Sequence, residues 1–271
     1  MLPANTKLGT INLAVKNLPL LRQFYRDILG LTILSETKNS ITLGDGHVPL
    51  VTLNRDTTLN FAEAHSVGLY HTAFVFSHRS RLAATLLTVF QYARNLYLGS
   101  GDHHVSEAFY LSDPEGNGVE LYFDRPGVAA TEVMQQTEAL DELAFMNSYL
   151  QGDGEGTIAM GHIHLKIGNI AQAKAFYVDI LGFSTMMEMP TALFVSAGGY
   201  HHHLGLNTWE SNGASARKPA LGLQNFEIIV PDDAAYKALK NRLEKHTIEF
   251  AEKKDSLHFE DPWGIGIVAR C

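Results

Sequence analysis

Short runs in which hydrophobic residues alternate with polar or small ones are separated by amphipathic segments and turns. The run Gly9–Leu13 alternates in this way, which predicts a half-buried strand. In the segment Phe24–Leu31, a Phe-Tyr pair and an Ile-Leu pair lie at helical spacing, which predicts an amphipathic helix facing a sheet. Gly30 stands where a helix end favours a positive φ. A strand followed by a covering helix is the first half of a βαβββ unit.

This pattern recurs 152 residues later in the chain. Gly161–Leu165 repeats the strand, and Phe176–Phe183 repeats the helix together with its terminal glycine. Self-similarity at a fixed distance indicates that a structural unit is repeated. The chain therefore contains at least two copies of one unit.

A weaker repeat opens at Gly68–Phe74 and recurs at Gly222–Ile228. Both of its copies close with an Asp-Pro-x-Gly turn, at Asp113–Gly116 and Asp261–Gly264, followed by an alternating strand. Together the two repeats define four modules, at residues 7–60, 66–125, 158–212 and 219–271. The expected fold class is α+β, with four βαβββ modules paired into two curved, barrel-like mixed sheets and the helices outside.

A linker at residues 126–157 is expected to separate modules one and two (7–125) from modules three and four (158–271). Within it, Thr131–Leu150 is helix-like, and Gly152–Gly156 has the composition of a flexible hinge. This hinge divides the chain into two halves of two modules each.

Composition narrows the class of partner. The chain has 271 residues, 45% of them hydrophobic and 18% charged, which is globular composition. Its net charge of −8 argues against nucleic acid or an anionic membrane surface, so the expected ligand is small. No apolar run reaches the ~18 residues of a membrane span, and the N-terminal segment lacks a signal-peptide pattern. The single cysteine, Cys271, excludes an internal disulfide, and we expect a cytoplasmic protein.

Residues that could carry chemistry fall into five segments. They are His71, Glu120, the pair His162 and His164 on one strand face, the pair His103 and His104, and the run His201–His203. Each has an ordinary interpretation: a single strand histidine or carboxylate is usually solvated or hydrogen-bonded, and a histidine run is often a surface tract. Taken together they favour a metal site, because two imidazoles and one carboxylate with open positions are typical of non-haem Fe(II) oxygenases.

The modules resemble the vicinal oxygen chelate superfamily, which includes glyoxalase I, fosfomycin- and bleomycin-resistance proteins and extradiol dioxygenases. The segment Tyr110–Glu120 is similar to the extradiol signature, and the Gly-Gly-Tyr-His-His-His run at Gly198–His203 is similar to that of bacterial catechol dioxygenases. The resemblance implies metal ligation by His71, Glu120 and His162.

The resemblance also implies roles for the other candidates. His103 or His104 would act as acid or base, and Tyr110 would hydrogen-bond a substrate oxygen. The residues expected to line the substrate pocket are His164, His201 and His203.

The implied activity is extradiol cleavage of a catechol-type aromatic with O₂ at a divalent metal, Fe(II) first and Mn(II) or Zn(II) as alternatives. The implied partners are a small aromatic substrate and O₂, with neither nucleic acid nor membrane, and a homodimer is left open. Two alternatives remain. One is a glyoxalase-like or epoxide-opening metal-dependent lyase or transferase, and the other is a metal-free small-molecule-binding protein of the resistance type.

Three positions in modules one and four lack the residue types expected of metal ligands. Thr10 of module one stands where the first metal histidine is expected, and in module four Asn225 and Val268 replace the second histidine and the glutamate. Modules one and four therefore cannot build this site. We infer a crossed arrangement in which module two pairs with module three, and module one pairs with module four.

Overall fold

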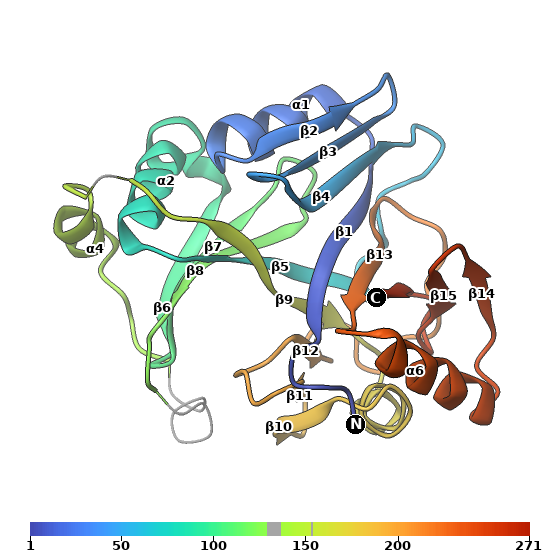
Figure 1. Ribbon diagram of the computed structural model, residues 1–271. Helices are drawn as coiled ribbons and strands as arrows, with labels where there is room; N and C mark the ends of the chain where they lie inside the picture. Colours follow the sequence, from blue (N-terminus) through green and yellow to red (C-terminus); the bar gives the residue numbers. More distant parts are fainter. Residues whose placement is uncertain (129–136, 153) are drawn as a thin grey trace. The chain divides into compact units, whose positions relative to one another are not determined.

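The computed structural model describes residues 1–128, 137–152 and 154–271 (Figure 1). Its strands fall into four groups that follow the four predicted modules. The first group is β1 (Lys7–Val15), β2 (Thr32–Glu36), β3 (Ser40–Asp45) and β4 (Val48–Arg55). The second is β5 (Gly68–Phe76), β6 (Tyr97–Asp102), β7 (Ser106–Ser112) and β8 (Gly118–Asp124). The third is β9 (Ile158–Lys166), β10 (Ser184–Met189), β11 (Ala192–Ser196) and β12 (Leu204–Asn207). The fourth is β13 (Gly222–Ile229), β14 (Phe250–Lys253), β15 (Ser256–Glu260) and β16 (Gly266–Arg270).

The described strands form two eight-stranded mixed sheets, and most of these strands are labelled in Figure 1. One has the order β14-β15-β16-β13-β1-β4-β3-β2, and the other has the order β10-β11-β12-β9-β5-β8-β7-β6. Modules one and four thus share the first sheet, and modules two and three share the second, which confirms the crossed pairing. Each sheet is open and ends in two edge strands, so neither is a closed barrel.

The chain also divides into two compact units. One unit contains Met1–Ala14, Thr58–Tyr70 and His162–Cys271, and the other contains Val15–Thr57 and His71–Gly161. In the second unit, Ala73, Ala108 and Tyr122 form a fully buried cluster on three neighbouring strands, against which Tyr110 packs. This cluster fixes the strands that carry the candidate site residues of module two.

The repeated helix begins as an α-helix and ends as a π-helix in both copies. In module one these parts are α1 (Leu18–Gln23) and η1 (Phe24–Ile28), and in module three they are α5 (Ile170–Ala173) and η3 (Lys174–Ile180). The π geometry appears in the hydrogen bonds from Leu29 N to Phe24 O and from Leu181 N to Phe176 O. The terminal glycines Gly30 and Gly182 have φ of 76° and 92°, as the pattern predicts.

A buried hydrogen bond connects each π-helix to the Asp-Pro turn of the following module. Tyr25 Oη donates to Asp113 Oδ2 at 3.2 Å, and Tyr177 Oη donates to Asp261 Oδ2 at 3.0 Å. Each aspartate also accepts backbone N–H groups of its own turn, at Glu115 and Asn117 in one copy and at Trp263 and Ile265 in the other. The turn and the helix are therefore fastened by the same carboxylate.

The other helices in the described residues are α2 (Arg79–Tyr92), the short 3₁₀ helix η2 (Arg94–Leu96), α4 (Glu142–Tyr149) and α6 (Asp233–Lys245). In the part of the chain that the structure describes, none of the helices is long and apolar enough to cross a membrane. Helix α4 packs against α2 (Figure 1), and the Phe145 ring lies 4.9 Å from the Phe109 ring of β7.

The helical prediction for Thr131–Leu150 is wrong over residues 137–141, and its first part, 131–136, lies outside the described residues. Helix α4 covers only Glu142–Tyr149, and Glu138 forms an isolated β-bridge with Asp102 instead. Asp141 ends the extended stretch because its side chain caps the helix by accepting from Ala144 N. Beyond the helix, Ser77 N donates to Thr157 O, which ties the end of the predicted linker to the residue that follows β5.

Candidate metal centre

His71 and Glu120 are brought together by neighbouring parallel strands. Strand β5 pairs with β8 so that Ala73 is opposite Glu120, and His71 lies two residues earlier on the same face. Their side chains meet through a contact of 2.9 Å between His71 Nε2 and Glu120 Oε2. Both residues are buried, with 7% and 3% of their surface exposed. A buried carboxylate requires a partner, and here an imidazole supplies one.

His162 completes the group that the sequence predicted. His71, Glu120 and His162 each offer one ligand atom, these atoms lie within 4.8 Å of one another, and all three residues are buried. Ligand atoms bound to one metal at ~2.0–2.2 Å are separated by about 3–4 Å, and a spacing within 4.8 Å is close to that range. Two imidazoles and one carboxylate also suit a borderline divalent metal. The donor set therefore fits a divalent metal in both spacing and chemistry.

The glycine before His162 has a steric reason. A Cβ atom at Gly161 would lie 1.8 Å from the Tyr122 hydroxyl, and Tyr122 is fully buried two residues after Glu120 on β8. Only a residue without a side chain can therefore occupy position 161. The Tyr122 side chain, two residues after Glu120, thus occupies the space that a side chain at position 161, next to His162, would need.

The two adjacent histidines His103 and His104 have different surroundings. His103 Nε2 lies 2.7 Å from Tyr110 Oη, and Tyr110 is directly opposite Glu120 on the neighbouring strand β7. The Tyr110 ring is also 5.8 Å from the His71 ring. His104 instead has a positive φ of 63° and approaches Glu138 at 3.5 Å. Of the two, His103 has the contact that connects it to the candidate centre.

The run His201–His203 precedes strand β12, so the alternation of a strand does not govern it. The His202 ring, to which the sequence assigned no role within this run, is 4.1 Å from the His162 ring, whereas the His201 ring is 5.9 Å away. His203 is held within its own module, since its Nδ1 accepts from Ala197 N and contacts Ser196 Oγ. Burial, reinforced by His201 and His162, lowers the pKa of His203 to about 4.

His164 lies in an aromatic environment. Its ring is 5.1 Å from Tyr70, 5.4 Å from Trp209 and 5.6 Å from Phe194. Its Nε2 contacts Asn207 Nδ2 at 3.0 Å, so the amide N–H donates to a ring nitrogen. Trp209 is 52% exposed, although a large aromatic side chain is usually buried. Side-chain chemistry alone did not identify Tyr70, Phe194 or Trp209, because aromatic residues in a strand pattern are usually core.

The corresponding positions of modules one and four show ordinary sheet chemistry. Asn12 Nδ2 donates to Asn225 Oδ1 at 2.9 Å, and Thr10 N donates to the Glu227 carboxylate at 3.0 Å. The Glu227 carboxylate also pairs with Arg270 at 3.0 Å. Amide and ion-pair contacts thus occupy the face where modules two and three place imidazoles.

Comparisons with known proteins show the family to which the chain is similar. The family model described as "Glyoxalase/Bleomycin resistance protein/Dioxygenase superfamily" matches residues 159–268. The chain is 34% identical over 273 residues to "Catechol-2,3-dioxygenase" of Bacillus subtilis (strain 168), which covers 95% of this chain and 94% of that relative.

Solved structures show the same fold. A putative dioxygenase from Bacillus subtilis subsp. subtilis str. 168 has a TM-score of 0.70 at 14% identity, covering 97% of this chain and 84% of that one. Glyoxalase I from Zea mays has a TM-score of 0.62 at 13% identity, covering 98% of this chain and 92% of that one. At these identities the likeness concerns the fold alone.

Proposed function

The chain belongs to the glyoxalase/bleomycin resistance protein/dioxygenase superfamily, and from this premise we propose that it is a metal-dependent extradiol dioxygenase acting on a catechol-type aromatic with O₂. The observation that carries the proposal is the buried group of His71, Glu120 and His162 beside the hydrogen-bonded pair of His103 and Tyr110. The name of the curated relative supports the reaction class.

His71, Glu120 and His162 would hold one divalent metal, Fe(II) first and Mn(II) or Zn(II) as alternatives. When bound, such a metal supplies Lewis acidity and open coordination positions, and iron adds redox chemistry toward O₂. Because the three residues are buried, water would compete little with their donor atoms for the metal. Glu120 also brings the only negative charge of the three, which partly neutralises the ion.

His103 and Tyr110 have the chemistry to manage protons at the substrate hydroxyl. A neutral imidazole accepts a proton near neutral pH, and its protonated form returns the proton later in the reaction. The Tyr110 hydroxyl lies 2.7 Å from His103 Nε2 and can bridge that ring and a substrate oxygen through hydrogen bonds. In extradiol cleavage the ring C–C bond beside the diol breaks and both atoms of O₂ enter the product, so protons must leave one oxygen and return to another.

His164, together with Tyr70 and Trp209, would form the wall that receives an aromatic ring. Edge-to-face aromatic contacts hold these rings at 5.1 Å and 5.4 Å from His164. An exposed tryptophan beside a buried polar ring suits a ligand that is apolar on its face and polar at its edge.

Oxygen consumption is the decisive measurement. Protein loaded anaerobically with Fe(II) should take up one O₂ per catechol and release an acyclic product. A non-oxidative superfamily enzyme with the same ligands would consume no O₂ while turning over a hemithioacetal or an epoxide. A binding protein of the resistance type would bind the aromatic without metal and without turnover. No O₂ uptake with any catechol, in protein shown to contain metal, would reject the proposal.

A further inference from the structure

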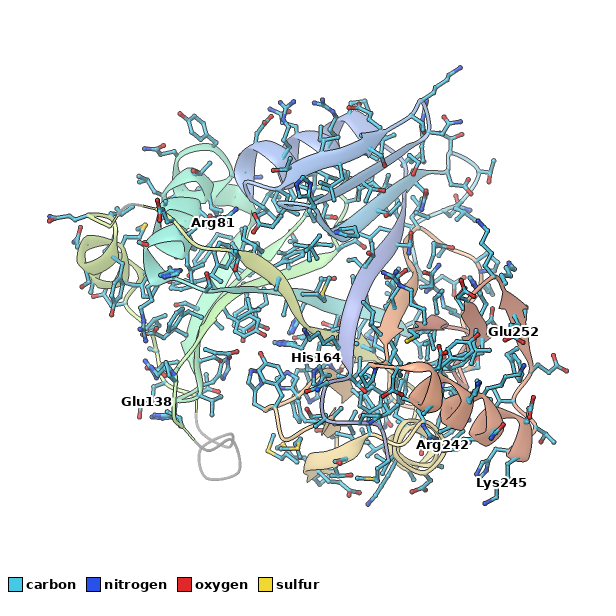
Figure 2. The ribbon with its side chains drawn as sticks, in the orientation of Figure 1. Arg81, Glu138, His164, Arg242, Lys245 and Glu252 are labelled. Atoms are coloured by element: carbon cyan, nitrogen blue, oxygen red, sulfur yellow. The ribbon has the colours of Figure 1, made fainter. Side chains whose placement is uncertain are left out.

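A segment of the predicted linker, residues 137–142, is docked along the edge strand β6. Asp102 and Glu138 exchange backbone hydrogen bonds of 2.9 Å in both directions. Further along, Ser100 Oγ donates to Leu140 O at 3.0 Å, and Tyr97 Oη donates to Glu142 Oε1 at 2.7 Å. Figure 2 labels Glu138 beside the end of β6. The docked segment is therefore fixed at several points.

Docking brings the first residue of this segment, Thr137, onto His103. The Thr137 hydroxyl lies 3.0 Å from His103 Nδ1, while Tyr110 Oη lies 2.7 Å from His103 Nε2 on the opposite side of the ring. Both ring nitrogens thus have a hydroxyl partner, and the imidazole is held at two points. A histidine held at one nitrogen presents a defined tautomer at the other.

Gly101 makes this approach sterically feasible. A Cβ atom at Gly101 would lie 3.0 Å from Thr137 Cγ2 and 3.4 Å from His103 Nε2. The Thr137 methyl group and the His103 ring therefore share the space above a residue without a side chain. Threonine at 137, glycine at 101 and histidine at 103 form one packed arrangement at the end of β6.

The two hydroxyls are chemically unequal, and this selects the tautomer. A phenol is more acidic than an aliphatic hydroxyl, so Tyr110 is the better donor and Thr137 is the better acceptor. The favoured arrangement has the Tyr110 O–H donating to His103 Nε2 and the His103 Nδ1–H donating to Thr137 Oγ1. In this form Nε2 is the basic nitrogen, and it faces Tyr110.

We propose that Thr137 is a positioning residue for the reaction, holding His103 as the Nδ1–H tautomer so that Nε2 serves as the base. The role of His103 as that base rests on the proposed function. The tautomer itself does not, because it follows from the two hydroxyl contacts.

Imidazole nitrogen NMR of protein labelled at histidine tests the proposal without any turnover. The His103 signal is assigned by its loss in His103→Gln. We expect the wild-type signal to show Nδ1–H, Thr137→Val to move it toward Nε2–H, and Thr137→Ser to restore the wild-type shifts. Thr88→Val is the matched control, because Thr88 is a partly buried threonine whose hydroxyl bonds within α2, to Ala84 O. Glu138→Ala is a second control that removes a neighbouring side chain and leaves the backbone bridge.

Activity of the iron-loaded protein supplies the second readout. Loss of one net hydrogen bond should lower kcat about 2- to 10-fold in Thr137→Val, with KM for the catechol little changed and kcat recovered in Thr137→Ser. His103 signals that are the same in wild type and Thr137→Val, or a wild-type Nε2–H tautomer, would overturn the proposal, as would an undiminished kcat. Absence of O₂ uptake in the wild type would instead reject the proposed function, and the spectra would still decide the role of Thr137.

Discussion

At the residue scale, the buried glutamates Glu120 and Glu107 of module two illustrate how position decides chemistry. Glu120 of β8 faces His71 of β5, whereas Glu107 of β7 pairs with Arg79 and Arg125. The motif Tyr110–Glu120 predicted Glu120 as a ligand, and the register of β8 with β5 gives the physical reason. Glu107 has an ordinary ion-pair role, and strand alternation alone would not have separated the two.

Replacing Glu120 with Gln should remove the metal. A neutral amide is a poorer ligand for a divalent ion than a carboxylate, and the charge that balances the ion is lost. We expect metal content after dialysis, measured by elemental analysis, to fall from about one per chain to near zero. Glu107→Gln is the matched control, because it removes a buried carboxylate outside the group and should leave the metal bound. Stoichiometric metal in Glu120→Gln would show that the ligand assignment is wrong.

The adjacent histidines give a second contrast. His103→Phe should lower kcat by ~10²–10⁴-fold with metal retained, because general acid–base help is lost while the ligands stay in place. For His104 the suitable change is Asn, since His104 has a φ of 63° and Asn tolerates that conformation better than Phe. We expect His104→Asn to keep near-normal kcat. Equal loss of metal and activity in His103→Phe would identify His103 as a ligand instead.

Other residues near the candidate site were beyond sequence reasoning, for reasons specific to each. The His202 ring is 4.1 Å from the His162 ring, and the histidine run precedes strand β12, so strand alternation could not indicate which of its three rings approaches His162. Thr137 acquires its contact only through a bridge between segments 36 positions apart, at Asp102 and Glu138. Neither contact has a local sequence signature.

At the scale of elements, the turns and helix ends were predictable because their chemistry is local. Gly116 and Gly264 have φ of 89° and 79° in the two Asp-Pro turns, and both donate N–H to the aspartate carbonyl. The π-helical turns and the tyrosine bonds to Asp113 and Asp261 were not predicted, because they depend on which element packs against which. The same limit applies to the docked segment.

The buried aspartate of module four makes stability depend on pH. Burial outweighs the hydrogen bonds from Ile265, Trp263 and Tyr177 and raises the pKa of Asp261 to about 6. An unfolded aspartate titrates near pH ~3.9, so the folded state binds the extra proton between about pH 4 and 6. Stability from this group is fully present below about pH 4 and is lost as pH rises through about 6. The difference is about 3 kcal/mol in the free energy of unfolding.

Asp261→Asn should remove this dependence, because the amide does not titrate. We expect the slope of the unfolding free energy between pH 4 and 6 to differ between wild type and variant, as measured by denaturant titration at several pH values. Comparing the slopes of the two proteins removes the contribution of the histidines, because both proteins contain the same histidines. Identical slopes in the two proteins would contradict a raised pKa at Asp261. Burial also raises the pKa of Asp113, so Asp113→Asn should change the slope in the same direction.

At the scale of the whole molecule, the crossed sheet order was predictable from what three positions lack. Thr10, Asn225 and Val268 cannot ligate a borderline metal as imidazole or carboxylate do, so only modules two and three could supply a complete set. The strand order places β9 next to β5 in one sheet, as this argument requires. The openness of the sheets was not predictable, since barrel closure depends on strand tilt and stagger, which residue types do not reveal.

The crossed order leads to a test with two fragments, residues 1–152 and 154–271. The first contains His71 and Glu120, and the second contains His162, so neither carries the complete ligand set. We expect each fragment alone to retain almost no metal after dialysis, and a mixture of the two to retain about one metal per pair. The matched control is a mixture in which the first fragment carries Glu120→Gln, and it should stay empty.

Heating the mixture offers an independent readout, because a ligand that binds only the assembled state stabilises it by ~4 kcal/mol at a thousandfold excess over Kd. The melting temperature of the mixture should therefore rise when Zn(II) is added, and that of either fragment should not. Stoichiometric metal in the fragment 154–271 alone would place the site on the histidines of module three, His162, His164 and His201–His203, without any ligand from module two. The crossed sheet would then have only a structural role, and Glu120 would not be a metal ligand.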